Sequence, residues 1–385
     1  MKFCFIIPLQ LELEQPGAYI SLGVAYLGAV LENYGYEVQI HDMNIDGEVF
    51  PEANVYGITC VSATFPSVHK IVSDLCQKGR IVIVGGIHPS IQPDDFKDLN
   101  CYIVTGEAED ILSKILKIKN KPEIINAGFI QDIDKLPFPA RHLFKNVVDY
   151  SGIHGQDIGV GATTIVSSRG CPYNCNFCTR IPQTQKVRFH SPEHMINELK
   201  TIISEYSIRH FRFVDDIFTL NKDRVMLLCD KLINEKLGIT WICITRADKL
   251  GKDLTLKMKK AGCTEIHIGV ESGSQRILDL MNKGISIESL ENAIKLIKET
   301  EIKAKTYLMY GFPGETIEDR QMTIDFIRKN KPDKVTISKF TAMPGSKMWK
   351  LNTLGTEQWF YQDYDLGYQN FKNKIKEVVG EHNVS

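Results

Sequence analysis

Three cysteines lie close together in the chain, and their spacing suits ligands of one metal centre. Cys171, Cys175 and Cys178 fall within a single stretch, residues 171–178. An extended chain covers about 3.4 Å per residue, so a folded loop of this length can enclose a cluster a few ångströms across. Three thiolates leave one corner of a cubic iron–sulfur cluster without a protein ligand, and an open metal position can bind a substrate. The spacing therefore predicts an open iron–sulfur centre.

Other uses of these cysteines need ligands that the neighbouring sequence does not offer. A structural zinc site needs four ligands, commonly in two separated pairs, whereas no fourth cysteine is near and His190 is the one close histidine downstream. A disulfide would leave one thiol over. The other seven cysteines are scattered singly, and ten in 385 residues are too few for a secreted disulfide scaffold. The pattern predicts an intracellular, cytoplasmic protein with one thiolate cluster, and structural zinc is the alternative.

Further polar residues follow or line predicted strands. Asp215 and Asp216 end one strand and are candidates for chemistry, although a role at a helix N-terminus explains each of them equally well. Residues 265, 267, 269 and 271 alternate along another strand and therefore share one face of it. His267 on that face is a weak catalytic candidate, and a hydrogen-bonded interior histidine is the simpler interpretation.

The elements that must position these residues begin with an alternating pattern in the first third of the chain. Short β-branched runs predict strands at residues 3–7, 37–40, 55–60, 81–84 and 102–104. Helical periodicity at 21–33, 67–78 and 109–117 falls between them, and the first two helices open with serine N-caps. This alternation predicts a parallel sheet wound on both faces. The segment between Ile40 and Val55 is too short for a comfortable crossover helix.

The alternation restarts beyond a proline-containing connector near residues 132–141. Strand patterns occur at 164–168, 210–214, 240–244, 265–270, 303–309 and 334–339, and helical patterns at 192–206, 223–235, 254–260, 287–300 and 317–329. About six such units predict a full or partial (β/α) barrel, whose chemistry lies at the carboxyl ends of its strands. We therefore predict an α/β chain with a doubly wound, Rossmann-like domain at 1–130, a linker at 131–160, a partial (β/α)6 barrel at 161–345 and a capping segment, rich in aromatic residues, at 346–385.

Charge and hydropathy exclude two classes of partner. The chain has 46 basic and 47 acidic side chains, a net charge of −1, which gives no electrostatic footprint for nucleic acid. No apolar run approaches the roughly 20 residues that a membrane-spanning helix needs. We therefore expect neither a nucleic acid nor a membrane as partner.

The motif Cys-x3-Cys-x2-Cys, with Phe177 before the last cysteine, resembles that of the radical S-adenosylmethionine (SAM) superfamily. The resemblance covers about residues 162–346. It implies a 4Fe–4S cluster on Cys171, Cys175 and Cys178, whose open iron is chelated by SAM. It further implies reductive cleavage of SAM to a 5′-deoxyadenosyl radical, which removes hydrogen from an unactivated carbon, with an electron donor such as flavodoxin or ferredoxin.

Five later segments also resemble that family, at residues 213–216, 245–248, 269–272, 311–315 and 342–346. Arg246 resembles the residue that holds the methionine carboxylate, and a guanidinium suits a carboxylate because both are bidentate. Glu271, in Gly-Val-Glu-Ser, resembles the residue that reaches the ribose, and residues 311–315 resemble the adenine-binding segment. The SAM-binding residues implied by the resemblance are Phe177, Asp215, Arg246, Glu271, Ser272, Gly311 and Glu315.

A doubly wound domain ahead of such a barrel resembles the cobalamin-binding subgroup of the superfamily. Loops after the third, fourth and fifth predicted strands carry this resemblance, because ligands of open α/β sheets lie beyond the carboxyl ends of the strands. The Asp-x-His-x-x-Gly motif that supplies an axial histidine elsewhere is not present. The implied cobalamin contacts are Ser62, Thr64, Gly85, Gly86, His88, Gly106 and Glu107, and a domain retained without cobalamin is the alternative.

The function expected from this resemblance is radical, cobalamin-dependent methyl transfer to a small-molecule substrate. A radical dehydration, epimerisation or rearrangement without cobalamin is the second hypothesis. A non-catalytic iron–sulfur or zinc-binding protein is the third, and it is disfavoured because the loop offers no fourth ligand.

Overall fold

The computed structural model describes residues 1–10, 19–115, 123–145, 147–150, 161–351 and 366–385. These residues form two compact units. The first comprises Met1–Ile165, Ile181–His190 and Thr201–His210, and the second comprises Val166–Arg180, Ser191–Lys200 and Phe211–Ser385. Among the described residues, the structure shows no helix that combines the length and the apolar character required to cross a membrane.

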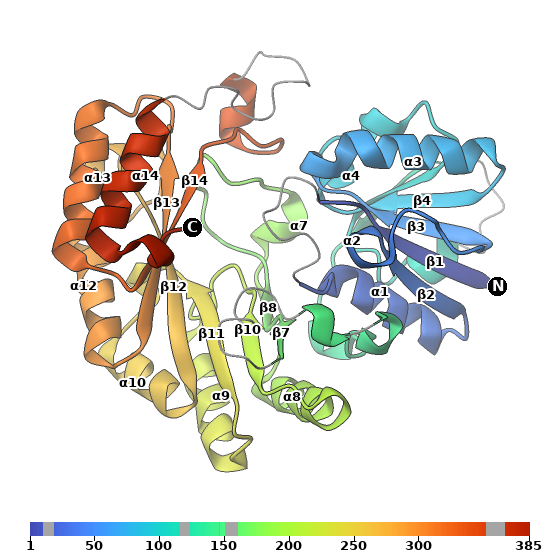
Figure 1. Ribbon diagram of the computed structural model, residues 1–385. Coiled ribbons are helices and arrows are strands. Elements are labelled where there is room, and N and C mark those ends of the chain that lie inside the picture. Colours follow the sequence, from blue (N-terminus) through green and yellow to red (C-terminus); the bar gives the residue numbers. More distant parts are fainter. Residues whose placement is uncertain (11–18, 116–122, 146, 151–160, 352–365) are drawn as a thin grey trace. The chain divides into compact units, whose positions relative to one another are not determined.

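The first unit is built on a parallel sheet with the strand order β2-β1-β3-β4-β5-β6. Helices α1 (Leu22–Asn33) and α3 (Phe65–Gln77) cover its opposite faces (Figure 1). This arrangement confirms the doubly wound fold. The strands are β1 (Lys2–Ile7), β2 (Glu37–Asp42), β3 (Val55–Thr59), β4 (Ile81–Gly85), β5 (Tyr102–Gly106) and β6 (Ile124–Gly128).

The connection between β2 and β3 contains only one short helix, α2 (Met43–Asp46), as the sequence spacing predicted. Its first turn is capped by the Asp42 side chain, which accepts a hydrogen bond from the amide of Asn44 at 3.0 Å.

Two local expectations for the first unit were wrong. Helix α3 begins at Phe65 after an N-cap at Thr64, not at a cap on Ser67, because Pro66 in the first turn has no amide hydrogen to satisfy. Strand β6 was not predicted at all. The predicted helix at 109–117 is α5 (Leu112–Ile115) within the described residues, and its positions 116–117 lie outside them.

The second sheet is also parallel, in the order β14-β13-β12-β11-β10-β7, and it forms the predicted partial barrel. Its strands are β7 (Ala162–Ile165), β10 (His210–Phe213), β11 (Thr240–Thr245), β12 (Cys263–Glu271), β13 (Lys303–Tyr310) and β14 (Lys334–Lys339). The predicted strand at 164–168 is in fact divided into β7 and the short β8 (Ser168–Arg169).

Helices follow these strands and lie along one face of the curled sheet (Figure 1). They are α8 (Pro192–Tyr206), α9 (Lys222–Glu235), α10 (Lys252–Lys260), α11 (Gln275–Leu280), α12 (Ile287–Glu299) and α13 (Ile317–Asn330). The even-numbered residues of β12, such as Ile266 and Ile268, are fully buried beneath these helices. The face that carries Glu265, His267 and Glu271 is therefore the inner face of the half-barrel.

The described C-terminal residues pack on this sheet. Helix α14 (Leu366–Val379) places the rings of Tyr368 and Phe371 5.3 and 5.4 Å from the ring of Tyr310. Beyond it, Val384 pairs with Val335 in a parallel bridge on the free edge of β14. The most aromatic part of the predicted capping segment, residues 359–364, lies outside the described residues.

Candidate active site

The three predicted metal ligands occupy one loop that follows β8. Cys175 is buried, Cys171 is half-buried and Cys178 is exposed, and all three are free thiols. The amide of Cys178 donates to the carbonyl of Cys175 at 3.3 Å, which closes the turn between the last two cysteines. Gly170 enters the loop with φ of +98°, a conformation that favours glycine, and its amide donates to Asp216.

The loop is anchored by side chains on both sides of its second cysteine. Asn176 donates from its amide to the carbonyl of Met281 and from Nδ2 to the carbonyl of Leu280, each at 2.8 Å. Asn282 donates from Nδ2 to the carbonyl of Asn174 at 2.7 Å. Residues 280–282, at the C-terminal end of α11, therefore fix the path of the cysteine loop. Sequence reasoning missed this segment because the partners are about a hundred residues apart.

Arg246, the predicted carboxylate-binding residue, contacts the same loop. Its guanidinium lies 3.7 Å from the ring centroid of Tyr173, and its Nε donates to Asp248 Oδ1 at 2.9 Å. Asp248 also accepts from the Tyr173 hydroxyl at 3.4 Å. Stacking of a guanidinium on an aromatic ring is favourable, especially when both are partly removed from water. The structure thus brings Arg246 and the cysteines together as expected.

Glu271 lies at the end of β12 in a conformation that is rare outside glycine, with φ of +65°. Its Oε1 pairs with Lys283 Nζ at 2.8 Å, and the two side chains are only 14% and 6% exposed. A Cβ at Gly269 would lie 2.5 Å from the same oxygen, so a side chain there would displace the carboxylate from its observed position. The Lys283 ammonium is also 5.9 Å from the ring centroid of Phe177, a residue that lies between Cys175 and Cys178 in the sequence.

Two cations make the loop favourable for a thiolate. The pKa of Cys175 is lowered to about 6, mainly by its hydrogen bond with Cys178 and also by the charges of Lys283 and Arg246, against the effects of burial and of the Glu271 charge. Burial raises the pKa of Cys171. Because thiolates rather than thiols bind metals, this cationic setting fits a metal centre held by cysteine. The three thiols on one anchored loop fit a three-thiolate iron–sulfur cluster.

Asp215 has its carboxylate turned into the fold. It is buried, and it accepts hydrogen bonds from the Ser167 amide at 3.1 Å, the Ser167 hydroxyl at 2.7 Å and the Ser168 hydroxyl. Arg224 donates to the carbonyl of Ser167 at 2.8 Å. These bonds fix the chain just before the cysteine loop. A direct contact of Asp215 with a cofactor remains a prediction.

The remaining predicted SAM contacts are also engaged within the second unit. The Ser272 hydroxyl lies 3.3 Å from the Thr323 hydroxyl. Glu315 Oε2 accepts from the amide of Gly311 at 2.8 Å and from Arg320 Nε at 3.0 Å, and burial raises the pKa of the Glu315 carboxyl. Gly311 has φ of +81°, which favours glycine in this turn. Contacts of Ser272, Gly311 and Glu315 with a cofactor remain predictions.

His267 belongs to a buried polar network on the inner face. Its Nε2 donates to Glu265 Oε1 at 2.6 Å, and its Nδ1 lies 2.9 Å from the hydroxyl of Tyr307. Burial lowers the pKa of His267 to about 4, whereas the histidine and Lys334 lower the pKa of Glu265 to about 2 despite its burial. The histidine is therefore neutral, and its Nδ1 accepts from Tyr307. These contacts support the interior interpretation.

In the first unit, His88 is not placed to bind cobalt. Its Nδ1 lies 3.1 Å from the Ser62 hydroxyl and its Nε2 lies 3.0 Å from Asp95 Oδ2. The ring is fully buried and stacks on Phe65 with a centroid distance of 4.5 Å. Burial lowers its pKa. Both ring nitrogens of His88 thus have partners within the unit, and a contact of this residue with cobalamin remains a prediction.

The other predicted cobalamin contacts lie at the carboxyl ends of the strands, where ligands of such sheets bind. Gly86 has φ of +109°, and a Cβ there would lie 2.7 Å from the carbonyl oxygen of Cys60. Gly85 and Gly106 end β4 and β5. Thr64 donates its hydroxyl to the carbonyl of Val61 at 3.1 Å.

Glu107 has a structural partner that the sequence did not reveal. Its carboxylate is held by both terminal nitrogens of Arg188, at 2.6 and 2.9 Å, and it accepts from the amide of Ile130 at 2.7 Å. A cofactor contact of Glu107 therefore remains a prediction, and one that competes with this ion pair.

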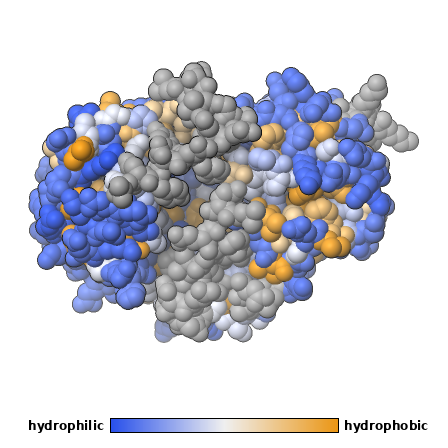
Figure 2. Space-filling view, turned by 45° about the horizontal axis from the view of Figure 1, so that its top comes forward, coloured by the Kyte–Doolittle hydropathy of each residue, from blue (hydrophilic) through white to orange (hydrophobic). Residues whose placement is uncertain are grey.

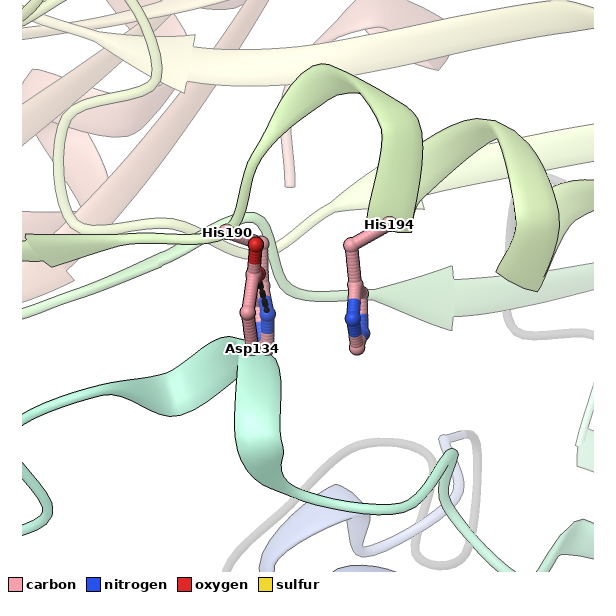
Figure 3. Close-up of side chains that lie close together, drawn as sticks. All are labelled: Asp134, His190 and His194. Atoms are coloured by element: carbon pink, nitrogen blue, oxygen red, sulfur yellow. Dashed lines mark hydrogen bonds and ion pairs between the residues drawn. The ribbon is translucent and has the colours of Figure 1, made fainter.

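His190, the histidine closest downstream of the cysteines, is occupied elsewhere. Figure 3 shows its Nδ1 beside Asp134 Oδ1, at 2.9 Å, and its Nε2 lies 3.4 Å from the Tyr26 hydroxyl. His190 is fully buried in the first unit. Both ring nitrogens have partners, which weakens the alternative of a zinc site completed by this histidine.

Comparison with known proteins supports the family resemblance predicted for each half of the chain. The radical SAM superfamily matches residues 165–327, and the B12 binding domain matches residues 14–116. A protein of Pyrococcus horikoshii, described as an uncharacterized methyltransferase, is 30% identical over 378 residues, which are 88% of this chain and 80% of the relative.

Other relatives differ in reaction and in length. A bacteriochlorophyllide d C-12(1)-methyltransferase of Chlorobaculum tepidum is 23% identical over 338 residues, 84% of this chain and 71% of the relative. An anaerobic magnesium-protoporphyrin IX monomethyl ester cyclase of Rubrivivax gelatinosus is 28% identical over 185 residues, 48% of this chain. The match spans only 33% of that cyclase.

Two solved structures share the fold. The radical SAM methyltransferase TsrM from Kitasatospora setae, with cobalamin and a [4Fe-4S] cluster bound, has a TM-score of 0.71 at 15% identity, over 90% of this chain and 73% of its own. The cobalamin-dependent SAM radical enzyme OxsB has a TM-score of 0.69 at 19% identity, over 100% of this chain and 58% of its own. At such identities the likeness concerns the fold alone.

Proposed function

Because this chain belongs to the radical SAM superfamily and carries a B12-binding domain, we propose that it is a cobalamin-dependent methyltransferase that acts on a small molecule. When bound on Cys171, Cys175 and Cys178, a 4Fe–4S cluster supplies the electron that cleaves SAM and starts radical chemistry. The single observation that carries the proposal is the anchored loop that presents three free thiols beside two cations.

Each residue of the loop's surroundings has a definite task in this proposal. Asn176 and Asn282 hold the thiols in place, and Arg246 and Lys283 favour their ionised state. Glu271 offers a carboxylate oxygen at the end of β12 as an acceptor for a sugar hydroxyl. The backbone of residues 311–315 provides space for a flat ring.

Methyl transfer is favoured over other radical reactions because the relative that is 30% identical over most of this chain is described as a methyltransferase. Matches to cyclases, one of which also spans most of this chain at lower identity, favour a second candidate, radical oxidation or rearrangement on the same scaffold. In both cases a low-potential electron donor, such as flavodoxin or ferredoxin, must reduce the enzyme.

Anaerobic reconstitution with iron, sulfide and cobalamin tests the proposal. We expect about one cobalamin per chain, cluster absorbance and, with SAM and a reductant, 5′-deoxyadenosine. Formation of S-adenosylhomocysteine as well indicates methyl transfer, whereas 5′-deoxyadenosine alone favours the second candidate.

The variant Cys175→Ala should lose the cluster absorbance and all 5′-deoxyadenosine. Cys76→Ser, at a half-buried thiol in the first unit, is the matched control and should keep both. Retention of both signals by Cys175→Ala would show that the ligand assignment is wrong.

A further inference from the structure

Lys283 is a buried cation whose position depends on several features of the second unit. Its side chain is 6% exposed and its ammonium pairs with Glu271 Oε1 at 2.8 Å. Gly269 leaves the room that this pair needs, since a Cβ there would lie 3.1 Å from Lys283 Nζ and 2.5 Å from the carboxylate. Burying a charge is costly unless it is paired, so the pair with Glu271 compensates the burial of Lys283.

The residue before it links Lys283 directly to the cysteine loop. Asn282 has φ of +51°, and its side chain donates to Asn174 in the loop at 2.7 Å. On the other side, the Lys283 ammonium lies 5.9 Å from the ring centroid of Phe177. The cation is thus held beside the segment that contains Cys175 and Cys178.

The two cations near the loop differ in their surroundings. Arg246 is shared between Asp248, at 2.9 Å, and the ring of Tyr173, and its charge is compensated by a carboxylate that bonds to the loop as well. Lys283 is compensated by Glu271, which lies at the end of an inner-face strand. Lys283 and Glu271 therefore place opposite charges within electrostatic range of Cys175 and Cys178.

We propose that Lys283 is a positioning residue that keeps Glu271 at the cluster site and offsets the negative charge that the cluster gains when it is reduced. The inference rests on the proposed cluster, but not on methyl transfer or on cobalamin. Reduction adds one electron, and therefore one negative charge, to the iron–sulfur group. A nearby cation stabilises the more negative state more strongly, whereas a nearby carboxylate destabilises it.

This electrostatic role predicts shifts of opposite sign for the two partners. Lys283→Gln should make the midpoint potential of the cluster more negative, and Glu271→Gln should make it more positive. Lys283→Arg keeps the charge and should restore a potential close to that of the wild type. Lys222→Gln, at an exposed lysine paired with Asp253, is the matched control and should not shift the potential.

The measurement is a dye-mediated redox titration of the full-length, anaerobically reconstituted protein, followed by electron paramagnetic resonance of the reduced cluster. SAM, cobalamin and substrate are omitted, so the outcome does not depend on the reaction catalysed. An unchanged potential in Lys283→Gln, or shifts of the same sign in both variants, overturns the inference. If Lys283→Gln does not hold the cluster, Glu271→Gln decides, and a potential that is unchanged or more negative overturns it. A wild-type protein without any reducible cluster would instead refute the proposed function.

Discussion

Arg188 forms a largely buried ion pair with Glu107 in the first unit, and its replacement by methionine should be strongly destabilising. The guanidinium donates to both oxygens of Glu107, to the carbonyl of Ile130 at 2.7 Å and, from Nε, to the carbonyl of Lys186 at 3.2 Å. The two side chains are 5% and 16% exposed. Methionine fills a similar volume but removes both bonds from the guanidinium to the Glu107 carboxylate, which is only 16% exposed.

Removal of one member of a buried ion pair costs about 3–5 kcal/mol, because the remaining charge is left without compensation. We expect this loss in the free energy of unfolding of the first unit for Arg188→Met. At about 2–4 °C per kcal/mol for a unit of this size, the melting temperature should fall by roughly 10 °C. Urea unfolding of the full-length protein at pH 7, followed by far-UV circular dichroism, measures the difference.

An exposed pair of the same chemistry supplies the control. Arg80 and Glu52 are also 2.6 Å apart, but their side chains are 37% and 81% exposed. Arg80→Met should therefore change stability by less than about 1 kcal/mol. The double variant Glu107→Met with Arg188→Met should recover part of the loss, since it leaves no isolated charge. Equal effects of Arg188→Met and Arg80→Met would refute the argument from burial.

Three further outcomes are expected. The pKa of His267 is lowered from 6.5 to about 4, so protonation of this histidine disfavours the folded state, and the free energy of unfolding falls by about 3 kcal/mol as the pH falls from 6.5 to 4. His267→Gln should remove this pH dependence from urea midpoints measured between pH 7 and 4. An unchanged slope in the variant would contradict the prediction. Gly86→Ala should lower the free energy of unfolding by about 2 kcal/mol or more in the same assay, because the new Cβ would lie 2.7 Å from the Cys60 carbonyl oxygen. Gly23→Ala is the control: it lies in a helix with open space around it, so it should be neutral or stabilising. Asn282→Ala should lower the iron bound per chain after reconstitution, since it removes the bond to the cysteine loop, and normal iron content would show that this anchor is dispensable.

The sequence predicted those parts of the fold that depend on local periodicity. The predicted helices that correspond to α8, α9, α10, α12 and α13 have ends within two residues of the observed ones, because apolar residues recur along one face. Helices α11 and α14 were not predicted. Strand β6 was missed because its residues are half-exposed or exposed and lack the buried, β-branched pattern of its neighbours. The start of α3 was misjudged because Thr64 and Pro66 were not weighed as an N-terminal signal.

The site was predictable where its residues are neighbours in the chain. Cys171, Cys175 and Cys178 are adjacent, so their convergence follows from spacing. Lys283 could not be found in this way, because its role depends on the turn after α11 meeting the inner face of β12. The use of Glu107 to bind Arg188 likewise depends on residues 81 positions apart.

The bridge between Val335 and Val384 bears on how this protein behaves at high concentration. Unpaired edge strands offer free amides and carbonyls on which other chains can add, which is a route to aggregation. Here the amide of Ile337 donates to Ser385 at 2.9 Å, and the Ser385 amide donates to Val335 at 3.0 Å. The chain thus shields the outer margin of its own half-barrel, and self-association by strand addition is blocked along that stretch of β14.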